Sequence, residues 1–262
     1  MGAGHRHSPT HRLHIPRRSA VHALPAHCKL VAVFCFVLVV VTTPGRAVWA
    51  FVLYAALLAA VTAVARIPPA TVLTRLLVEA PFVVFALLLP FTVPAGPGER
   101  VTVLGLTLSE PGLWGAWNIL AKATLGVAAS VLLAATTEIR ALLLGLERLR
   151  LPPLLVQIAS FMIRYADVVA DDLRRMAVAR RSRGFEARGP RHWGVLAKTA
   201  GALFIRTYER GERVHLAMLS RGYTGTMPAL RPDTAATRAQ WTYAAALPAA
   251  ALAVRLLGGN PL

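Results

Sequence analysis

Five long stretches of the chain are almost free of charged residues, and they constrain its fold more than any other feature. A helix needs about 20 mostly apolar residues to cross the hydrocarbon core of a bilayer. The stretches that reach or approach this length are Leu30–Thr43, Ala47–Ala65, Leu76–Val93, Trp117–Thr136 and Trp241–Leu257. Hydrophobic residues make up 56% of the chain and charged residues only 16%, against roughly 25% in soluble domains. We therefore predict an all-α, polytopic membrane protein with about five or six transmembrane helices.

The chain nevertheless carries a net charge of +17, and the positions of its basic residues predict its orientation. Residues 1–29 contain five Lys and Arg and no acid, and residues 137–238 contain 18 against nine Asp and Glu. Cytoplasmic segments of plasma-membrane proteins are enriched in Lys and Arg. We therefore expect a cytoplasmic tail at 1–29, a four-helix transmembrane region at 30–136, a cytoplasmic region at 137–238 and a last transmembrane helix at 241–257. A cleaved signal peptide is the alternative for the N-terminus, and the long basic region disfavours it.

The predicted transmembrane helices offer few groups that a substrate could use. Within the first four stretches, the ionisable residues are Glu79 and Lys122. Both are expected near the ends of their helices. No internal repeat is evident, whereas secondary carriers are commonly built from repeats and place polar groups at mid-membrane depth. We therefore expect a coupling or scaffold subunit, with a stand-alone secondary transporter as the alternative.

Two long amphipathic helices are predicted in the cytoplasmic region, over Leu154–Gly184 and Leu196–Gly222. Apolar residues recur along both at spacings of three and four, which is the pattern of a helix with one apolar face. On the polar face of the first, Asp171 with Arg175 and Asp167 with Arg174 are expected to pair. The apolar faces are suited to the membrane interface or to the transmembrane helices.

Both amphipathic helices end in the same way, and these ends are the candidate functional site. The two motifs are Ser182-Arg183-Gly184 followed by Phe185, and Ser220-Arg221-Gly222 followed by Tyr223. Glycine just past a helix end closes the last turn in the left-handed conformation, and arginine suits the negative end of the helix dipole. One such end alone is ordinary. Two matching ends in one region predict guanidinium groups that dock into acidic pockets of a partner.

The region around these motifs resembles the transmembrane T component of energy-coupling factor (ECF) transporters, and is closest to the cobalt-type CbiQ family. The resemblance rests on Arg164-Tyr165, on Arg180 to Phe185, on Tyr208 to Arg213 and on Ala217 to Tyr223. It implies that two ABC ATPase subunits drive the transporter and that a small substrate-binding membrane subunit captures the substrate. The T component joins them, and its two arginine motifs dock into the ATPases. Many relatives have Ala where this chain has Ser182.

The resemblance points to cobalt as the substrate, although nickel and a vitamin stay open because the T component does not select the substrate. The chain has no phosphate-binding Gly-x-x-x-x-Gly-Lys-Ser/Thr loop, so we expect it to bind no ATP and no cofactor and not to be an enzyme. A membrane-tethered nucleic-acid binder is a further alternative, since the basic run Arg180–Arg183 attracts phosphate. Interleaved acids and the lack of an aromatic stacking platform disfavour it.

Histidines in the N-terminal tail are the remaining candidates for metal binding. His5, His7, His11 and His14 have side chains that suit cobalt, nickel or zinc. Their spacing fits no defined site, and Arg6, Arg12, Arg17 and Arg18 would repel a cation. We therefore predict no metal site in this chain.

Overall fold

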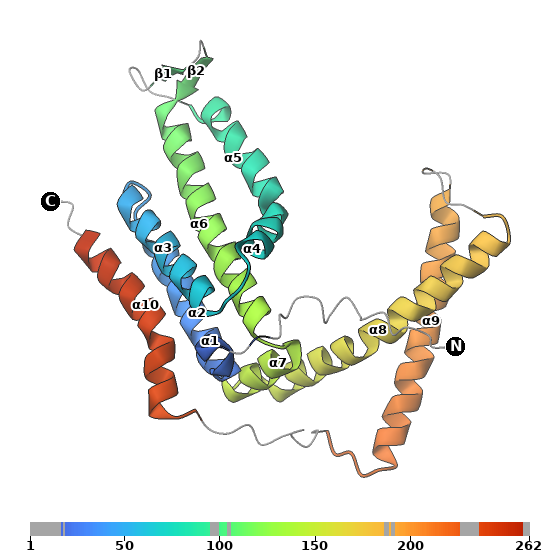
Figure 1. Cartoon of the computed structure of the whole chain (residues 1–262). Helices are drawn as coiled ribbons and strands as arrows, with labels where there is room; N and C mark the ends of the chain where they lie inside the picture. Colours follow the sequence, from blue (N-terminus) through green and yellow to red (C-terminus); the bar gives the residue numbers. More distant parts are fainter. Residues whose placement is uncertain are drawn as a thin grey trace. The chain divides into compact units, whose positions relative to one another are not determined.

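The computed structural model describes residues 17, 19–94, 100–103, 106–185, 189, 192–225 and 236–258. Contacts divide the described chain into two compact units (Figure 1). The first, here called the bundle unit, contains α1 to α7 and α10. The second, here called the crossed pair, contains α8 and α9.

The bundle unit is built almost entirely of helices. Its elements are α1 (Ala20–Ala23), α2 (Ala26–Thr42), α3 (Val48–Val64), α4 (Pro69–Leu76), the 3-10 turn η2 (Leu77–Glu79), α5 (Ala80–Thr92), β1 (Arg100–Val103), β2 (Leu106–Ser109), α6 (Glu110–Thr136), α7 (Ile139–Arg148) and α10 (Arg238–Gly258). By length and composition, Pro69–Thr92, Glu110–Thr136 and α8 can cross a membrane, and α2 and α3 are shorter apolar helices. The predicted all-α polytopic fold is confirmed.

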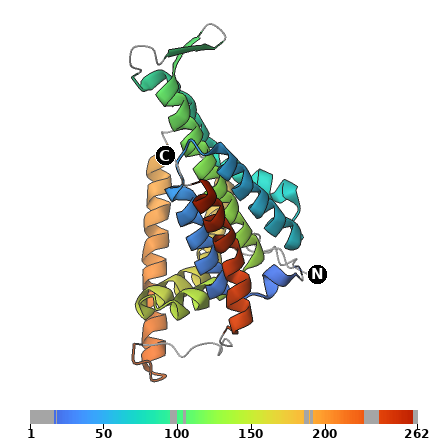
Figure 2. The same cartoon turned by 90° about the vertical axis from the view of Figure 1, so that its left-hand side faces the viewer.

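Helix α2 lies at the centre of the bundle unit and packs against α6, α7 and α10, while α4 and α5 lie along α6 (Figures 1 and 2). Its buried Phe36 meets Tyr54 of α3 edge to face, with 6.1 Å between the ring centroids. The Tyr54 hydroxyl is within 3.1 Å of the Thr43 hydroxyl, so a polar group inside an apolar core keeps a partner. The core is thus that of one continuous helical bundle.

Hydrogen bonds fix which helix ends share an end of the bundle. Lys29 Nζ, in the first turn of α2, donates to the Thr136 carbonyl at the end of α6 over 3.0 Å. Arg255 Nη1, near the end of α10, donates to Thr42 Oγ1 at the end of α2 over 2.7 Å. Helix α6 therefore ends at the end of the bundle where α2 begins, and α10 finishes at the opposite end.

Three features of the bundle unit differ from the predicted elements. The segment 94–113, between two of the predicted transmembrane helices, contains the antiparallel hairpin β1–β2, in which Arg100 pairs with Ser109. Helix α6 begins at Glu110, seven residues before the predicted start, because Ser109 caps it by accepting from the Gly112 N–H over 3.3 Å. Helix α7, within the predicted cytoplasmic region 137–238, packs against α2.

The crossed pair consists of α8 (Pro153–Ser182) and α9 (Trp193–Leu219), which are antiparallel and cross in Figure 1. Their bounds agree to within three residues with the predicted amphipathic helices. Gln157 near the start of α8 bonds to Tyr223 beyond the end of α9. Arg180 near the end of α8 donates to Thr199 in α9 over 2.7 Å. These contacts set the antiparallel register of the two helices.

Candidate functional site

The ends of α8 and α9 have the same backbone geometry. The Phe185 N–H donates to the Arg180 carbonyl over 3.1 Å, and the Gly184 N–H donates to the Arg181 carbonyl over 2.9 Å. At the end of α9, the N–H groups of Tyr223 and Gly222 donate to Met218 and Leu219 over 3.1 and 3.0 Å. Both ends are therefore Schellman motifs, in which crossed backbone bonds close the last helical turn.

The two motif glycines have the positive φ that this turn requires. The φ angle is +72° at Gly184 and +81° at Gly222, as the sequence predicted. At either glycine, a Cβ atom would meet no atom outside the local backbone within 4 Å. Glycine is needed at these positions because of the backbone conformation, not because of crowding.

The residues around each motif arginine also match. Ser182 Oγ donates to the Ala179 carbonyl and Ser220 Oγ to the Ala217 carbonyl, each over 3.0 Å. The following aromatic ring meets a histidine ring edge to face in both cases, with centroid distances of 5.2 Å for Phe185 with His192 and 6.5 Å for Tyr223 with His215. The two helix ends thus match in their side-chain contacts as well as in their backbone geometry.

Arg183 and Arg221 are exposed, and each directly follows the serine of its motif at the helix end. Within the described part of the chain, neither guanidinium forms a hydrogen bond or an ion pair. A guanidinium has five donors in a planar fork and binds carboxylates in bidentate fashion. Each helix end therefore presents an exposed cation, without a partner in the described part of the chain, on a backbone that the Schellman motif holds in place.

The two arginines lie at opposite ends of the crossed pair. Arg183 follows α8 near the start of α9, since Arg180 contacts Thr199. Arg221 follows the end of α9, whose 27 residues span about 40 Å at 1.5 Å per residue. One small ligand cannot bind both groups, so the arrangement suits two separate docking sites on partner proteins.

An ion pair joins the two helices between these ends. Arg210 Nη2 of α9 lies 2.9 Å from Asp172 Oδ2 of α8, and both side chains are largely buried. Neither pairing predicted within α8 is formed in the described structure: Arg174 pairs with Asp171 at 3.0 Å, and not with Asp167, and Asp171 does not pair with Arg175. Asp171 is on the exposed side of the helix, where the residue three positions later is the nearer neighbour.

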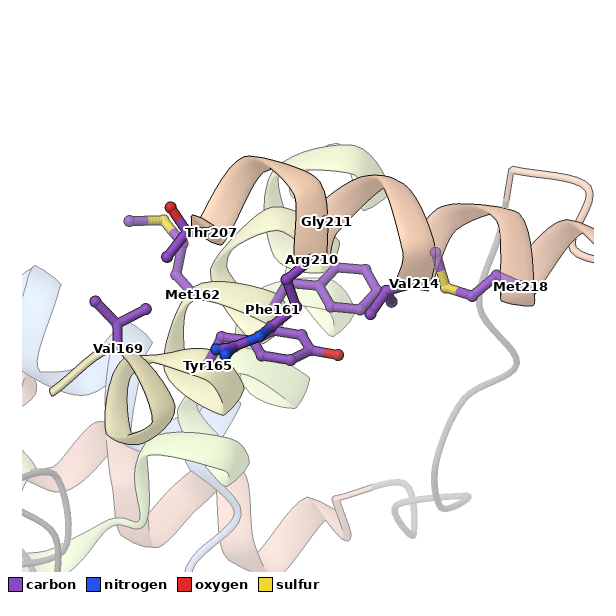
Figure 3. Close-up of a pocket in the computed structure, with 9 residues that line it drawn as sticks. All are labelled: Phe161, Met162, Tyr165, Val169, Thr207, Arg210, Gly211, Val214 and Met218. Atoms are coloured by element: carbon purple, nitrogen blue, oxygen red, sulfur yellow. The ribbon is translucent and has the colours of Figure 1, made fainter. Parts of the chain in front are cut away.

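A cavity of about 340 Å³ lies between α8 and α9 beside this ion pair (Figure 3). Aromatic, aliphatic and methionine side chains line most of it, together with Arg210. These lining residues are Phe161, Met162, Tyr165, Val169, Thr207, Gly211, Val214 and Met218. Other apolar residues of the pair, among them Leu154, Phe204 and Leu216, are 64–70% exposed. Some apolar residues of the crossed pair thus line the cavity, and others form an exposed surface. They do not form a single apolar face.

Two ionisable residues lie within the predicted transmembrane helices, and the sequence placed both near helix ends. Glu79 is the last residue of η2 and the N-cap of α5, as expected. Lys122 instead lies near the middle of α6, because this helix begins seven residues before the predicted start. Glu79 is buried and accepts a hydrogen bond from Thr124 Oγ1 over 2.9 Å.

The described residues offer no candidate metal centre. Among them, no group of three or more His, Cys, Asp or Glu side chains is placed to hold a metal ion. The candidates His5, His7, His11 and His14 lie outside the described residues. Neither Cys28 nor Cys35 is in a disulfide, and Cys28 is buried on α2.

The contacts that join the two helices of the crossed pair were not predicted from the sequence. Gln157 and Thr199 were not singled out, and Tyr223 was noted only as the aromatic residue after its motif; the two bonds join residues 19 and 66 positions apart along the chain. One signal was present for Gln157, which is a lone polar residue in the apolar run Leu154–Ile158. A polar side chain at such a position commonly has a specific partner.

The fold and the composition define this chain as a helical membrane protein, with two matched arginine ends on a separate helix pair. The chain belongs to the CbiQ family of cobalt transport proteins, whose model matches residues 17–231. It is 31% identical to an uncharacterized protein of Methanocaldococcus jannaschii over 49% of this chain and 46% of that protein. It is 29% identical to the cobalt transport protein CbiQ of Rhodobacter capsulatus over 51% of this chain and 54% of that protein. A second uncharacterized protein of M. jannaschii is 31% identical over 40% of each chain. The matches thus span about half the length of these curated relatives.

Proposed function

We propose that this protein is the transmembrane energy-coupling subunit of an ECF-type ABC importer. In this role two ABC ATPase subunits dock on the ends of α8 and α9, and a small substrate-binding membrane subunit captures the substrate. The observation that carries the proposal is the pair of matching Schellman ends, each presenting an exposed arginine. Two ATPase subunits need two docking groups, and the chain supplies two.

The separation of the arginines supports the same assignment. Along α9, Arg183 and Arg221 are about 40 Å apart. Two protein subunits can contact groups at this separation, whereas one small ligand cannot. The chain contributes no phosphate-binding loop of its own, so the ATP sites belong to the partner subunits. Coupling then consists of ATP-driven displacement of the two helix ends.

The substrate we propose is the cobalt ion, which follows from family membership. Capture of the ion belongs to the substrate-binding subunit, and the described residues of this chain hold no cluster of metal ligands. We propose further that the protein lies in the plasma membrane with its N-terminus, α8 and α9 on the cytoplasmic side. The excess of Lys and Arg in residues 1–29 and 137–238 supports this orientation.

The experiment that tests the proposal reverses both docking charges. Arg183→Glu with Arg221→Glu is expected to abolish Co²⁺ uptake by cells that express the complete transporter, while the protein still inserts into the membrane. The matched control is Arg175→Glu with Arg206→Glu, which makes the same charge change at exposed positions on the same two helices. Uptake that survives the docking reversal would overturn the proposal, and so would uptake by the purified chain alone in liposomes.

A further inference from the structure

The cavity between α8 and α9 contains a buried hydrogen-bond donor that no residue of the described chain satisfies. Arg210 lines the cavity, and its side chain extends from α9 towards α8 (Figure 3). Its Nη2 pairs with Asp172 Oδ2, 2.9 Å away, whereas its Nη1 is buried without a hydrogen-bond partner in the described structure. A buried donor without an acceptor costs free energy. This atom therefore indicates that the cavity binds a ligand that offers an oxygen to Arg210.

The rest of the lining is suited to an apolar chain. On the α8 side Phe161 and Tyr165 are stacked, with 6.3 Å between their ring centroids. Met162 and Met218 also line the cavity, and the flexible thioether side chain adapts to irregular shapes. On the α9 side, a Cβ atom at Gly211 would meet no atom outside the local backbone within 4 Å. Water is a poor occupant, because such a lining leaves most of its hydrogen bonds without partners.

The volume of the cavity limits what can enter it. It is about 340 Å³, near the lower end of the range for small-molecule sites. An α-helix of a partner protein is about 10 Å across with its side chains and is too wide for this space. A single chain fits it better than a helix does.

The charge of the site indicates which polar group the ligand carries. The Asp172 carboxylate already balances the charge of Arg210, so a second buried anion would lack a counter-charge and cost more than a neutral acceptor. The Tyr165 hydroxyl, which forms no hydrogen bond within the described chain, is a further donor on the same cavity. A neutral carbonyl oxygen has two lone pairs and can accept from either donor.

Exposed apolar side chains of the crossed pair favour lipid as the source of such a ligand. Leu154, Met162 and Phe204 are 64–70% exposed, and α8 is long and apolar enough to cross a membrane. Exposed apolar surface of this kind marks contact with a membrane or with another protein. The acyl chain of a membrane phospholipid combines an apolar chain with a neutral ester carbonyl.

We infer that the cavity between α8 and α9 binds one acyl chain of a membrane phospholipid, whose ester carbonyl accepts a hydrogen bond from Arg210 Nη1. The chain lies between the Phe161 and Tyr165 rings of α8 and Gly211 of α9. The bound lipid thereby stabilises the crossing of the two helices, because both of them line the cavity. This inference requires no ATPase subunit and stands apart from the proposed function.

The test uses the full chain in phosphatidylcholine vesicles that contain a phospholipid with a photoreactive acyl chain. Mass spectrometry of the cross-linked peptides is expected to find the lipid on the parts of α8 and α9 that line the cavity. Gly211→Leu is expected to reduce this labelling about fivefold or more, because the new side chain occupies the space of the acyl chain. Gly201→Leu is the matched control on the same helix, since it is equally uncrowded and outside the lining. It is expected to leave the labelling unchanged.

An ether-linked phospholipid with the same photoreactive chain tests the carbonyl without any change to the protein. It is expected to label the cavity about tenfold less, the effect of losing one hydrogen bond to a charged group. The free fatty acid with this chain is also expected to label less than the ester lipid, because its carboxylate would be buried without a counter-charge. Stronger labelling by the fatty acid would overturn the assignment to a phospholipid.

Three results would overturn the inference as a whole. One is equal labelling by the ester and ether lipids, and another is labelling that Gly211→Leu does not reduce. The third is labelling spread evenly over the exposed apolar residues of α8 and α9, which would indicate a general lipid-facing surface and no defined site.

Discussion

Asp172 of α8 and Arg210 of α9 form an ion pair across the crossed helices, with 2.9 Å between Oδ2 and Nη2. The side chains are 13% and 28% exposed, and Arg210 Nη1 is buried without a partner in the described structure. The pair therefore fixes the middle of the crossing, between the contacts at its two ends.

Removal of this carboxylate is expected to destabilise the crossed pair. Asp172→Ala leaves the largely buried Arg210 guanidinium without its counter-ion, at a cost of about 1–3 kcal/mol. Glu209→Ala is the matched control, because Glu209 and Arg213 are 3.8 Å apart with side chains more than half exposed. Such a surface pair contributes less than about 1 kcal/mol. Denaturant unfolding in detergent compares the two variants, and equal losses would contradict this account of the crossing.

Alanine at position 222 is expected to destabilise the protein because of the left-handed backbone conformation there, and not because of crowding by neighbouring atoms. Gly222→Ala is expected to lower the free energy of unfolding by about 1 kcal/mol, because φ is +81° there although no atom crowds the site. Gly201→Ala, inside α9 and equally uncrowded, is expected to stabilise the protein by up to about 1 kcal/mol. Thermal unfolding measures both, and shifts of the same sign would contradict the assigned backbone conformations.

The buried ammonium of Lys29 is expected to contribute to the stability of the bundle unit. It donates to the Thr136 carbonyl and to Thr137 Oγ1 over 3.0 and 3.3 Å, which satisfies the end of α6. Lys29→Met keeps the aliphatic stem, leaves these acceptors without a donor and is expected to cost about 1–3 kcal/mol. Lys122→Met removes an ammonium that has no partner among the described residues. A loss as large for Lys122→Met would argue against a specific role of Lys29.

The proposed orientation predicts which sites a membrane-impermeant thiol reagent reaches. In a chain without Cys28 and Cys35, a cysteine at Arg46 is expected to react in intact cells, because the exposed Arg46 lies in the turn at the end of the bundle opposite Lys29. A cysteine at Arg183 is expected to react only after the membrane is permeabilised. The reverse pattern would show that the protein is inserted the other way round.

Local sequence patterns were sufficient to predict the long apolar and amphipathic helices and the backbone of the two arginine ends, but not the short helix α7. Apolar runs locate a transmembrane helix because a bilayer requires a fixed length of them, and Gly184 and Gly222 mark helix ends because few other residues adopt their φ angles. The hairpin β1–β2 was missed within a segment rich in Gly and Pro, although Val101-Thr102-Val103 and Leu106-Thr107-Leu108 alternate as strands do.

Contacts between residues far apart in the sequence could not be predicted from such local patterns. Asp172 and Arg210 are 38 residues apart, and their pairing depends on where α8 and α9 cross. Spacing along a helix favoured partners within α8, so Asp171 was expected to pair with Arg175. Lys122 was placed near a helix end because the apolar run that contains it begins at Trp117, whereas α6 begins at Glu110.

The number of ATPase subunits that co-purify with this chain tests the proposed coupling role most directly. In the absence of nucleotide, the wild-type chain is expected to retain two ATPase subunits, each single variant, Arg183→Glu or Arg221→Glu, one, and the double variant none. Two subunits retained by the double variant would contradict the proposal that Arg183 and Arg221 are the docking groups.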